Sequence, residues 1–533
     1  MTTNNQDPWE HFKANYHSFP DAKLAIDLSR LSFSKPWLGS VIPKFDRAFK
    51  SMRLLELGTI ANPDEERMVG HYWLRNPALA PTPTIENDIN QSLSSIKDFA
   101  RKIHQHEIQG DNGPFTHLLL IGIGGSALGP QLAAHALGHP VNDKLFPLFL
   151  DNTDPDGIER TLLKLKDRLG KTLVLVISKS GGTKETYNGM MEVIHAYKQA
   201  NLNFSRHAVA ITGINSKLDK FATSNAWLAR FPMWDWVGGR TSETSVVGLL
   251  PAILQGIDIE QFISGAKTID TLTRNPDLNQ NPAALLAMSW YFCGQGAGKK
   301  DMVILPYKDR LELMSRYLQQ LVMESLGKEF DLQGNQVNQG IAVYGNKGST
   351  DQHAYVQQLR DGVHNFFVTF IEVLKDQEGT PIQVSDGITS GDYLQGFLMG
   401  TRAALHAKQR ESITLTLDEL TPFTLGVLIG LFERAVGLYA FVIGINAYHQ
   451  PGVEAGKVAA ENVIELNKQV INLLRTNPKR SFKVEDIASA LNAISETESI
   501  FHLLNRFVRN SDTRVHSDSN PGLSPFARSY WFE

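Results

Sequence analysis

The sequence predicts an α/β protein with two tandem doubly wound parallel sheets and helical segments at both ends. The first observation is a series of short apolar runs that alternate with helical stretches, as in sheets with crossover helices. These runs cover residues 118–121, 145–150, 173–177 and 208–212. The second observation is that the alternation resumes at 302–305, 341–344 and 366–371, with a long helix predicted over 311–326. Two alternating regions predict two α/β domains.

The segments outside these regions are predicted to be helical. In the first segment, a helix begins at the N-cap Thr84 and places Ile85, Ile89 and Leu93 on one face. In the last segment, a helical pattern starts near residue 458. The predicted parts are a helical N-terminal region (1–114), two α/β domains (115–275 and 276–460) and a helical C-terminal extension (461–533).

The composition describes an ordinary globular protein and excludes several classes. With 42% apolar and 20% charged residues and a net charge of −4, the chain has no broad basic surface for nucleic acid. The single cysteine, Cys293, excludes an intrachain disulfide and a cysteine-based zinc site. The most hydrophobic region, 420–448, is interrupted by Glu433 and Arg434, and the polar N-terminus lacks the apolar core of a signal peptide. We therefore expect a cytoplasmic protein without a membrane or nucleic-acid partner.

Residues 173–186 carry the clearest chemical signal. An apolar run typical of a buried strand ends in the polar sequence SKSGGT at 178–183, and a helical pattern resumes at Glu185. A strand, a small polar loop and a helix start together present backbone N–H groups to an anion. Hydroxyl donors stand at Ser178, Ser180, Thr183 and Thr186. The stretch favours a phosphate monoester and lacks the spacing of a Walker loop, and the alternative is an ordinary turn rich in Ser and Thr.

The first apolar run ends in a second glycine-rich loop, GIGGSA at 122–127. Formally it contains GxGxxA, a permitted form of the dinucleotide fingerprint, with Asp143 and Asp151 downstream. A sugar monophosphate explains the glycines equally well, because glycine at the carboxyl end of a strand serves any ligand there. Together with the loop at Ser178, the run favours a small phosphorylated ligand held by two loops of one sheet.

Four further polar residues carry no catalytic signal on their own. Gln320 and Glu324 are four residues apart and share a helix face, yet an isolated glutamate of this kind is usually a surface carboxylate. His353 is one of 16 histidines, and Lys457 has the setting of a solvated lysine near a helix start. Spacing alone makes none of them catalytic.

Six short blocks, taken in order, change this interpretation. GIGGS, SKSGGTKET, VGGR, QQxxMESxGK, QHA and QxGVExGK lie between about residues 115 and 460, and their combination resembles the glucose-6-phosphate isomerase family. The resemblance implies two sugar-isomerase (SIS) domains of flavodoxin-like topology. It implies a catalytic set of Arg240, Glu324, His353 and Lys457. It also implies a substrate-binding set of Gly125, Ser126, Ser178, Lys179, Ser180, Thr183, Thr186, Gln320 and Gln450.

The resemblance implies reversible isomerisation of glucose 6-phosphate to fructose 6-phosphate, a step of glycolysis and gluconeogenesis. By resemblance, His353 and Lys457 act in ring opening, Glu324 moves a proton between C2 and C1 through a cis-enediol(ate), and Arg240 holds the developing charge. It implies no cofactor and no metal.

The same resemblance implies a homodimer with shared active sites, in which His353 reaches the partner's site.

Two alternatives stay open at this point. One is a phosphosugar-binding SIS regulator, and the other is a dinucleotide-dependent oxidoreductase built on the GIGGSA run. Two positions depart from the family pattern, with Thr241 in place of an aromatic residue and His449 in place of Asp or Asn.

Overall fold

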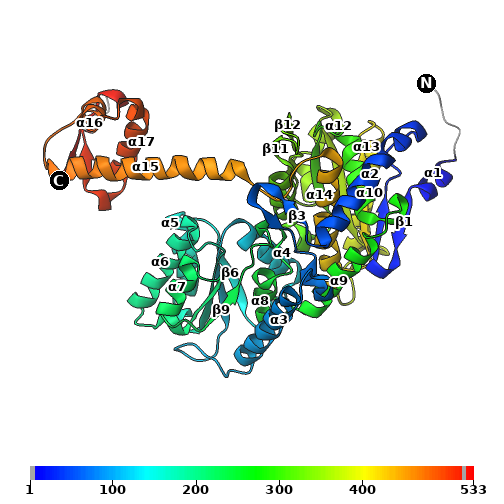
Figure 1. Cartoon of the computed structure of the whole chain (residues 1–533), viewed down its shortest axis with the longest axis horizontal. Helices are drawn as coiled ribbons and strands as arrows, with labels where there is room; N and C mark the ends of the chain where they lie inside the picture. Colours follow the sequence, from blue (N-terminus) through cyan, green and yellow to red (C-terminus); the bar gives the residue numbers. More distant parts are fainter. Residues whose placement is uncertain (1–6, 519–523) are drawn as a thin grey trace. The chain divides into compact units, whose positions relative to one another are not determined.

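The computed structural model describes residues 7–518 and 524–533, apart from the side chains of residues 453–455, 457 and 458. Contacts along the backbone divide the chain into two units, Met1–His449 and Gln450–Glu533. Figure 1 follows the elements of both units from blue at the N-terminus to red at the C-terminus. Each unit has its own hydrophobic core and is described by itself.

The first unit contains a five-stranded parallel sheet with helices on both faces. Its strand order is β6-β5-β7-β8-β9. The strands are β5 (His117–Ile121), β6 (Phe146–Leu150), β7 (Thr172–Ser178), β8 (Ala208–Thr212) and β9 (Ala229–Pro232). One face carries α5 (Pro155–Leu165), α6 (Lys184–Gln199) and α7 (Lys217–Ser224), and the other α3 (Pro83–His104), α4 (Leu128–Leu137) and α8 (Val246–Gln255) (Figure 1). Because successive side chains of a strand point to opposite faces, Val174 and Val176 enter one core and Leu173 and Leu175 the other.

The same unit contains a six-stranded sheet in the order β1-β2-β17-β14-β10-β13. Its parallel strands are β10 (Asp301–Pro306), β13 (Val343–Tyr344), β14 (Phe366–Val373) and β17 (Ser412–Leu417). Helices α10 (Pro282–Cys293) and α14 (Pro422–Ile443) pack on one face, and α12 (Val356–Asp361) and α13 (Ser390–His406) on the other. Two mostly parallel sheets, each covered on both faces, confirm the predicted fold class.

The N-terminal region contains strands as well as helices, which corrects the prediction of a helical region. Strand β1 (Tyr16–Phe19) pairs antiparallel with β2 (Leu24–Asp27), and β2 pairs antiparallel with β17. Both strands have four residues, and every residue of β2 is buried, so no alternation of polar and apolar residues marks it. The region also contains α1 (Pro8–Ala14), α2 (Lys35–Glu56), β3 (Ile60–Asn62) and β4 (Arg67–Met68).

Two predicted helices differ in detail from the structure. The helix expected to start at Thr84 is α3, and its N-cap is Thr82, whose hydroxyl accepts a hydrogen bond from Ile85 N at 3.3 Å. The long helix expected over 311–326 is interrupted. It contains α11 (Met314–Leu318) and a six-residue π-helix, Gln319–Glu324. The short strands β11 (Lys328–Phe330) and β12 (Gln336–Gln339) follow, and β15 (Gln383–Ser385) and β16 (Ile388–Thr389) form a separate hairpin.

Helix α14 is almost entirely buried in the first unit. It is long and apolar enough to cross a membrane by length and composition alone, contrary to the sequence expectation, but 89% of its most apolar window is buried inside the protein. Its two charged residues, Glu433 and Arg434, are buried as well. Arg434 Nε lies 2.8 Å from Asp270 Oδ1, and Arg75 pairs with both Asp270 and Glu433. The charges that interrupt the apolar sequence therefore belong to a buried ion-pair cluster.

The described part of the second unit has three α-helices, three short 3-10 turns and a two-stranded sheet around a small core. The elements are α15 (Pro451–Thr476), α16 (Val484–Ala490), α17 (Thr497–Arg509), β18 (Val515–Ser517) and β19 (Tyr530–Phe532). Leu474, Ile487, Ile500 and Leu504 lie in its core. The domain boundaries predicted at 114/115, 275/276 and 460/461 stay predictions.

Helices α14 and α9 (Ile259–Leu272) approach each other backbone to backbone, which leads to a stability prediction. A Cβ atom on Gly426 would lie 2.1 Å from Phe262 O. Gly426→Ala should therefore lower the free energy of unfolding by about 1–3 kcal/mol, as overpacking does in other cores. Gly39→Ala in α2, where no atom lies within 4 Å of the new Cβ, should raise it by about 0.5–1 kcal/mol. Urea unfolding of both variants checks this, and equal stabilities would contradict the close helix contact.

Candidate active site

The loop after β7 is the predicted phosphate loop, and its hydroxyls bond to the loop itself. Ser178 Oγ accepts a hydrogen bond from Gly181 N at 3.1 Å and donates one to Thr183 Oγ1 at 3.2 Å. Ser180 Oγ accepts from Gly182 N at 3.1 Å. Thr186 lies in the first turn of α6 and is 3% exposed. Hydroxyls and backbone N–H groups thus gather between the end of β7 and the start of α6.

Lys179 connects this loop to the segment that leads to Arg240. Its Nζ donates to the carbonyl oxygens of Asp235 and Val237, both at 3.1 Å. Burial lowers the pKa of Lys179, and the nearby Asp235 carboxylate opposes that shift. The side chain therefore contacts protein carbonyls, while its main chain belongs to the phosphate loop.

The GIGGS loop after β5 touches two other sequence blocks. A Cβ atom on Gly125 would lie 2.1 Å from Gly239 O, so the loop packs directly on the VGGR backbone. Gly124 has φ +58°, and a Cβ there would lie 2.9 Å from Gln320 Nε2. Ser126 ends the single helical turn Gly124–Ser126. Glycine is required at Gly125 because any side chain would push the Gly239 backbone away, and it is favoured at Gly124 by the left-handed φ.

Arg240 lies at the centre of the predicted site and is 9% exposed. Its Nε donates to Ser325 Oγ at 3.0 Å and its Nη2 to Ala447 O at 2.8 Å. Its Nη1 lies 3.3 Å from Glu324 Oε1. Burial lowers the pKa of Arg240, whereas the adjacent Glu324 raises it, and a guanidinium remains charged in such a setting.

Gln320 and Glu324 both lie on the π-helix, next to the loops of the first sheet. Gln320 reaches the GIGGS loop and Glu324 reaches Arg240. A π-helix is rare and is frequently found at functional sites. The structure thus brings together five of the predicted residues, namely Gly125, Ser126, Arg240, Gln320 and Glu324.

Three predicted residues, His353, Gln450 and Lys457, belong neither to this group nor to the phosphate loop. His353 ends the helical turn Thr350–His353 and is exposed. Gln450 is the first residue of the second unit, and Lys457 lies in α15, where its side chain is outside the described part of the structure.

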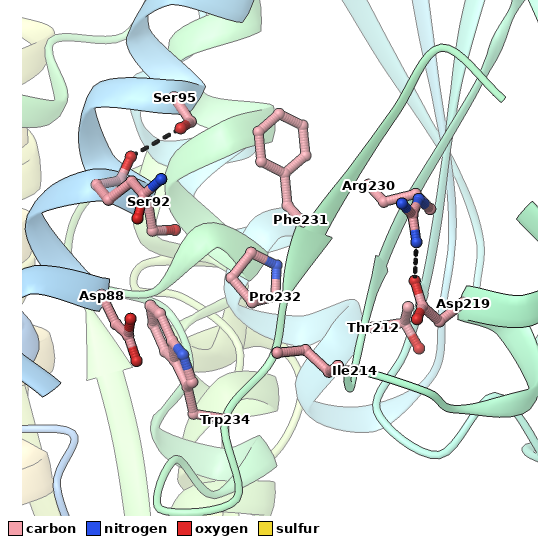
Figure 2. A pocket seen from close by; sticks show the side chains of 11 residues that line it. Asp88, Ser92, Ser95, Thr212, Ile214, Asp219, Arg230, Phe231, Pro232 and Trp234 are labelled. Carbon is pink, nitrogen blue, oxygen red and sulfur yellow. Dashed lines mark hydrogen bonds and ion pairs between the residues drawn. The ribbon is translucent and has the colours of Figure 1, made fainter. Parts of the chain in front are cut away.

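Two cavities lie at the carboxyl ends of strands of the first sheet. One of about 180 Å³ is lined by Ser178, Thr183 and Thr186 together with apolar residues of α6 and α7. The other, of about 370 Å³, is lined by residues of α3 and β9 and by Thr212, Ile214 and Asp219, and Figure 2 shows Trp234 beside Asp88 on one side and the Arg230–Asp219 ion pair on the other. None of the predicted site residues lines the second cavity.

The structure does not favour a dinucleotide at the GIGGSA run. The carboxylate of Asp151, directly after β6, already accepts from Gln131 Nε2 at 2.8 Å and pairs with Arg316 at 3.2 Å. Gly125 is covered by the Gly239 backbone, where a pyrophosphate would need to approach. Among the described residues, no group of three or more His, Cys, Asp or Glu side chains could hold a metal ion.

The two doubly wound sheets, the hydroxyl-rich loop after β7 and the buried Arg240–Glu324 contact define the chain as an α/β protein with a candidate anion-binding site. A family model described as phosphoglucose isomerase matches residues 46–476. The chain belongs to the phosphoglucose isomerase family.

Individual relatives cover nearly the whole chain. The glucose-6-phosphate isomerase of Geotalea daltonii is 55% identical over 524 residues, which cover 98% of each chain. That of Cyanothece sp. is 56% identical over 503 residues, 94% of this chain and 95% of the relative. The crystal structure of a glucose-6-phosphate isomerase from Chlamydia trachomatis is similar with a TM-score of 0.77 at 26% identity, covering 86% of this chain and 91% of that one.

The contact between Gly125 and Gly239 leads to a second prediction. Gly125→Ala should force the GIGGS and VGGR loops apart and lower the free energy of unfolding by about 1–3 kcal/mol. It should also reduce the rise in Tm that inorganic phosphate produces in the wild type. Gly238→Ala is the matched control, because its new Cβ would have Thr241 Oγ1 at 3.5 Å as its nearest neighbour. Thermal melting with and without phosphate checks this, and identical behaviour of the two variants would refute the contact.

Proposed function

We propose that this chain catalyses the reversible isomerisation of glucose 6-phosphate to fructose 6-phosphate, with Arg240 and Glu324 at the reacting carbons. The reaction is inferred from membership of the phosphoglucose isomerase family. The roles of Arg240 and Glu324 are inferred from the 3.3 Å contact between their side chains. The chain is an aldose–ketose isomerase of glycolysis and gluconeogenesis, and its family is cytoplasmic. The regulator and the oxidoreductase considered above are thereby set aside.

Glu324 is the proposed base that moves the proton between C2 and C1. Its side chain is 20% exposed, so it is open to a ligand, and its carboxylate is oriented by Arg240. A carboxylate that takes the proton from one carbon and returns it to the next needs no second acid–base group for this step. The sugar is neither oxidised nor reduced overall, so the reaction balances without a redox cofactor.

Arg240 is the proposed electrostatic group. As Glu324 accepts the proton, negative charge moves from its carboxylate to the O1 and O2 atoms of the cis-enediol(ate). A fixed cation beside both positions stabilises the charge throughout the step. The hydrogen bonds to Ser325 and Ala447 support this role, because they hold the guanidinium in place before substrate arrives.

The phosphate group of the substrate is proposed to bind at Ser178, Ser180, Thr183 and Thr186, with Lys179 contributing its main chain. The N–H groups of Gly181 and Gly182, now bonded to hydroxyls, become donors to the phosphate when those hydroxyls turn toward it. Gly125, Ser126, Gln320 and Gln450 complete the proposed substrate contacts. Binding at this unreactive end orients the reacting carbons.

The decisive experiment is a coupled assay of fructose 6-phosphate conversion combined with Glu324→Gln. The amide keeps the shape of the side chain but cannot accept a proton, so kcat should fall by about 10²–10⁴-fold with little change in substrate affinity. Glu329→Gln, an exposed glutamate on the neighbouring β11, is the control and should retain wild-type kcat. If Glu324→Gln stays within a few-fold of the wild type, another residue is the base.

We further propose that ring opening uses His353 and Lys457 and that the chain acts as a homodimer with shared sites. His353 is exposed, and its neighbour Gln352 donates to Phe397 O at 3.0 Å on α13. On that helix Tyr393 and Phe397 are 47% and 45% exposed. Exposed aromatic side chains beside a proposed catalytic residue support an interface between two copies that brings His353 to the other chain's Glu324.

Complementation between inactive subunits tests the shared site. Mixed His353→Ala and Glu324→Ala homodimers, unfolded and reassembled at random, should yield about half hybrids, and each hybrid should have one intact site under two-fold symmetry. Recovered activity should approach about a quarter of the wild-type value. If hybrids form and activity stays at the level of the parents, His353 serves its own chain.

A further inference from the structure

Lys328 is a buried lysine beside the proposed base, and the mechanism above does not use it. It is the first residue of β11 and is 5% exposed. Its Nζ donates to the main-chain carbonyl oxygen of Glu324 at 2.7 Å. Glu324 is the last residue of the π-helix, so this ammonium holds the carbonyl at its C-terminal end.

The charges around Lys328 are unusual for a buried lysine. None of the described carboxylates lies within 4.0 Å of its Nζ, whereas buried lysines are normally paired. The groups that act on its charge are Arg240, Glu324 and Asp64, and its own charge acts on His449. Burial, together with the positive charge of Arg240, lowers the pKa of Lys328 to about 8, while Glu324 and Asp64 oppose the shift.

We propose that Lys328 is a positioning residue for Glu324, and that its ammonium also provides a second positive charge next to Arg240. The inference rests on the role proposed for Glu324. The bond to the Glu324 carbonyl fixes the backbone from which the carboxylate extends. Misplacing a catalytic group by about 1 Å can cost about 10²-fold in rate, so a single main-chain bond at this residue matters.

The second charge acts on the whole proton transfer. One negative charge starts on the Glu324 carboxylate and moves to the sugar oxygens, while Arg240 and Lys328 stay fixed. Two cations near this charge stabilise it in both places and in the transition state between them. When Lys328 loses its proton, the site keeps only Arg240, so the rate should decline as the pH rises through about 8.

The same burial makes Lys328 a destabilising residue in the folded protein. Its folded-state pKa of about 8 is below the ordinary value of 10.5, so the unfolded chain binds the proton more tightly. The penalty is fully present below pH 8, shrinks between pH 8 and 10.5, and is absent above that range. If a lysine served only the fold, its removal would lower the stability of the folded protein instead of raising it.

Lys328→Met and Lys328→Arg test the proposal in the full chain. Lys328→Met should lower kcat by about 10- to 100-fold, leave KM within a few-fold, and lose the decline of kcat near pH 8. Its Tm should be at or above that of the wild type at pH 7, with a difference that shrinks toward pH 10. Lys328→Arg, which keeps its charge at all these pH values, should retain more activity than Lys328→Met and also lose the alkaline decline.

Lys300→Met is the matched control. Lys300 is also largely buried, but its Nζ lies 2.7 Å from Glu411 Oε2, at the amino end of β10. Its removal takes away the lysine partner of Glu411, which keeps only its contact with His364, so Tm should fall while kcat stays within a few-fold of the wild type.

Two results would overturn the inference while leaving the proposed function intact. One is an active wild type with Lys328→Met within threefold of its kcat. The other is a Lys328→Met variant whose Tm falls as it does in Lys300→Met. A wild type without isomerase activity would overturn the proposed function and this inference together.

Discussion

The buried guanidinium of Arg240 is the interaction on which the site depends. It belongs to the segment after the first sheet, yet its partners come from the π-helix block and from the loop after α14. A cation with 9% exposure is stable only when its donors are satisfied, so all these segments must be in place before the charge is tolerated. Assembly of the first unit and burial of the Arg240 charge therefore occur together.

The buried ion-pair cluster around Glu433 and Arg434 holds α14 in place, and α14 precedes the loop that binds Arg240. The Arg434 guanidinium lies 3.8 Å from the ring centre of Tyr72 and pairs with Asp270 and Glu56, while Glu433 pairs with Arg75. Helix α14 leads directly to the loop that carries Ala447. Breaking one buried pair of this kind costs about 3–5 kcal/mol because a charge is left uncompensated. The cluster thus fixes the helix from which the Arg240 acceptor loop begins.

Much of the fold could be predicted from sequence because the central strands are continuous apolar runs that a parallel sheet requires. Strand β2 escaped prediction because its four buried residues acquire their role only by pairing with β17, far away in the sequence. The π-helix that interrupts the predicted helix also depends on residues distant in the sequence, which pack around it. The sequence of the helix alone therefore could not predict the interruption. The glycine and hydroxyl loops were readable, because their residue types are tied to backbone shape and anion binding.

The burial of Lys328 and Arg240 could not be predicted from the sequence. Both stand in polar sequence blocks, where a positive charge is normally solvated. Only the tertiary structure brings the hairpin residue Asp64, the π-helix and the loop after α14 around them. Sequence therefore indicates which residues could act, and the packing determines which charges are desolvated.

The pairing of β2 with β17 has a consequence for how the chain is made. The first sheet uses strands from one continuous stretch, His117 to Pro232, and can assemble while later residues are still being synthesised. The second sheet is completed later, because β1 and β2 leave the ribosome first and the partner of β2, Ser412–Leu417, emerges much later. During that interval β2 can pair with β1 but lacks β17 on its other edge, so that edge is open to other chains and to chaperones. The second sheet is therefore completed only after most of the chain has been synthesised.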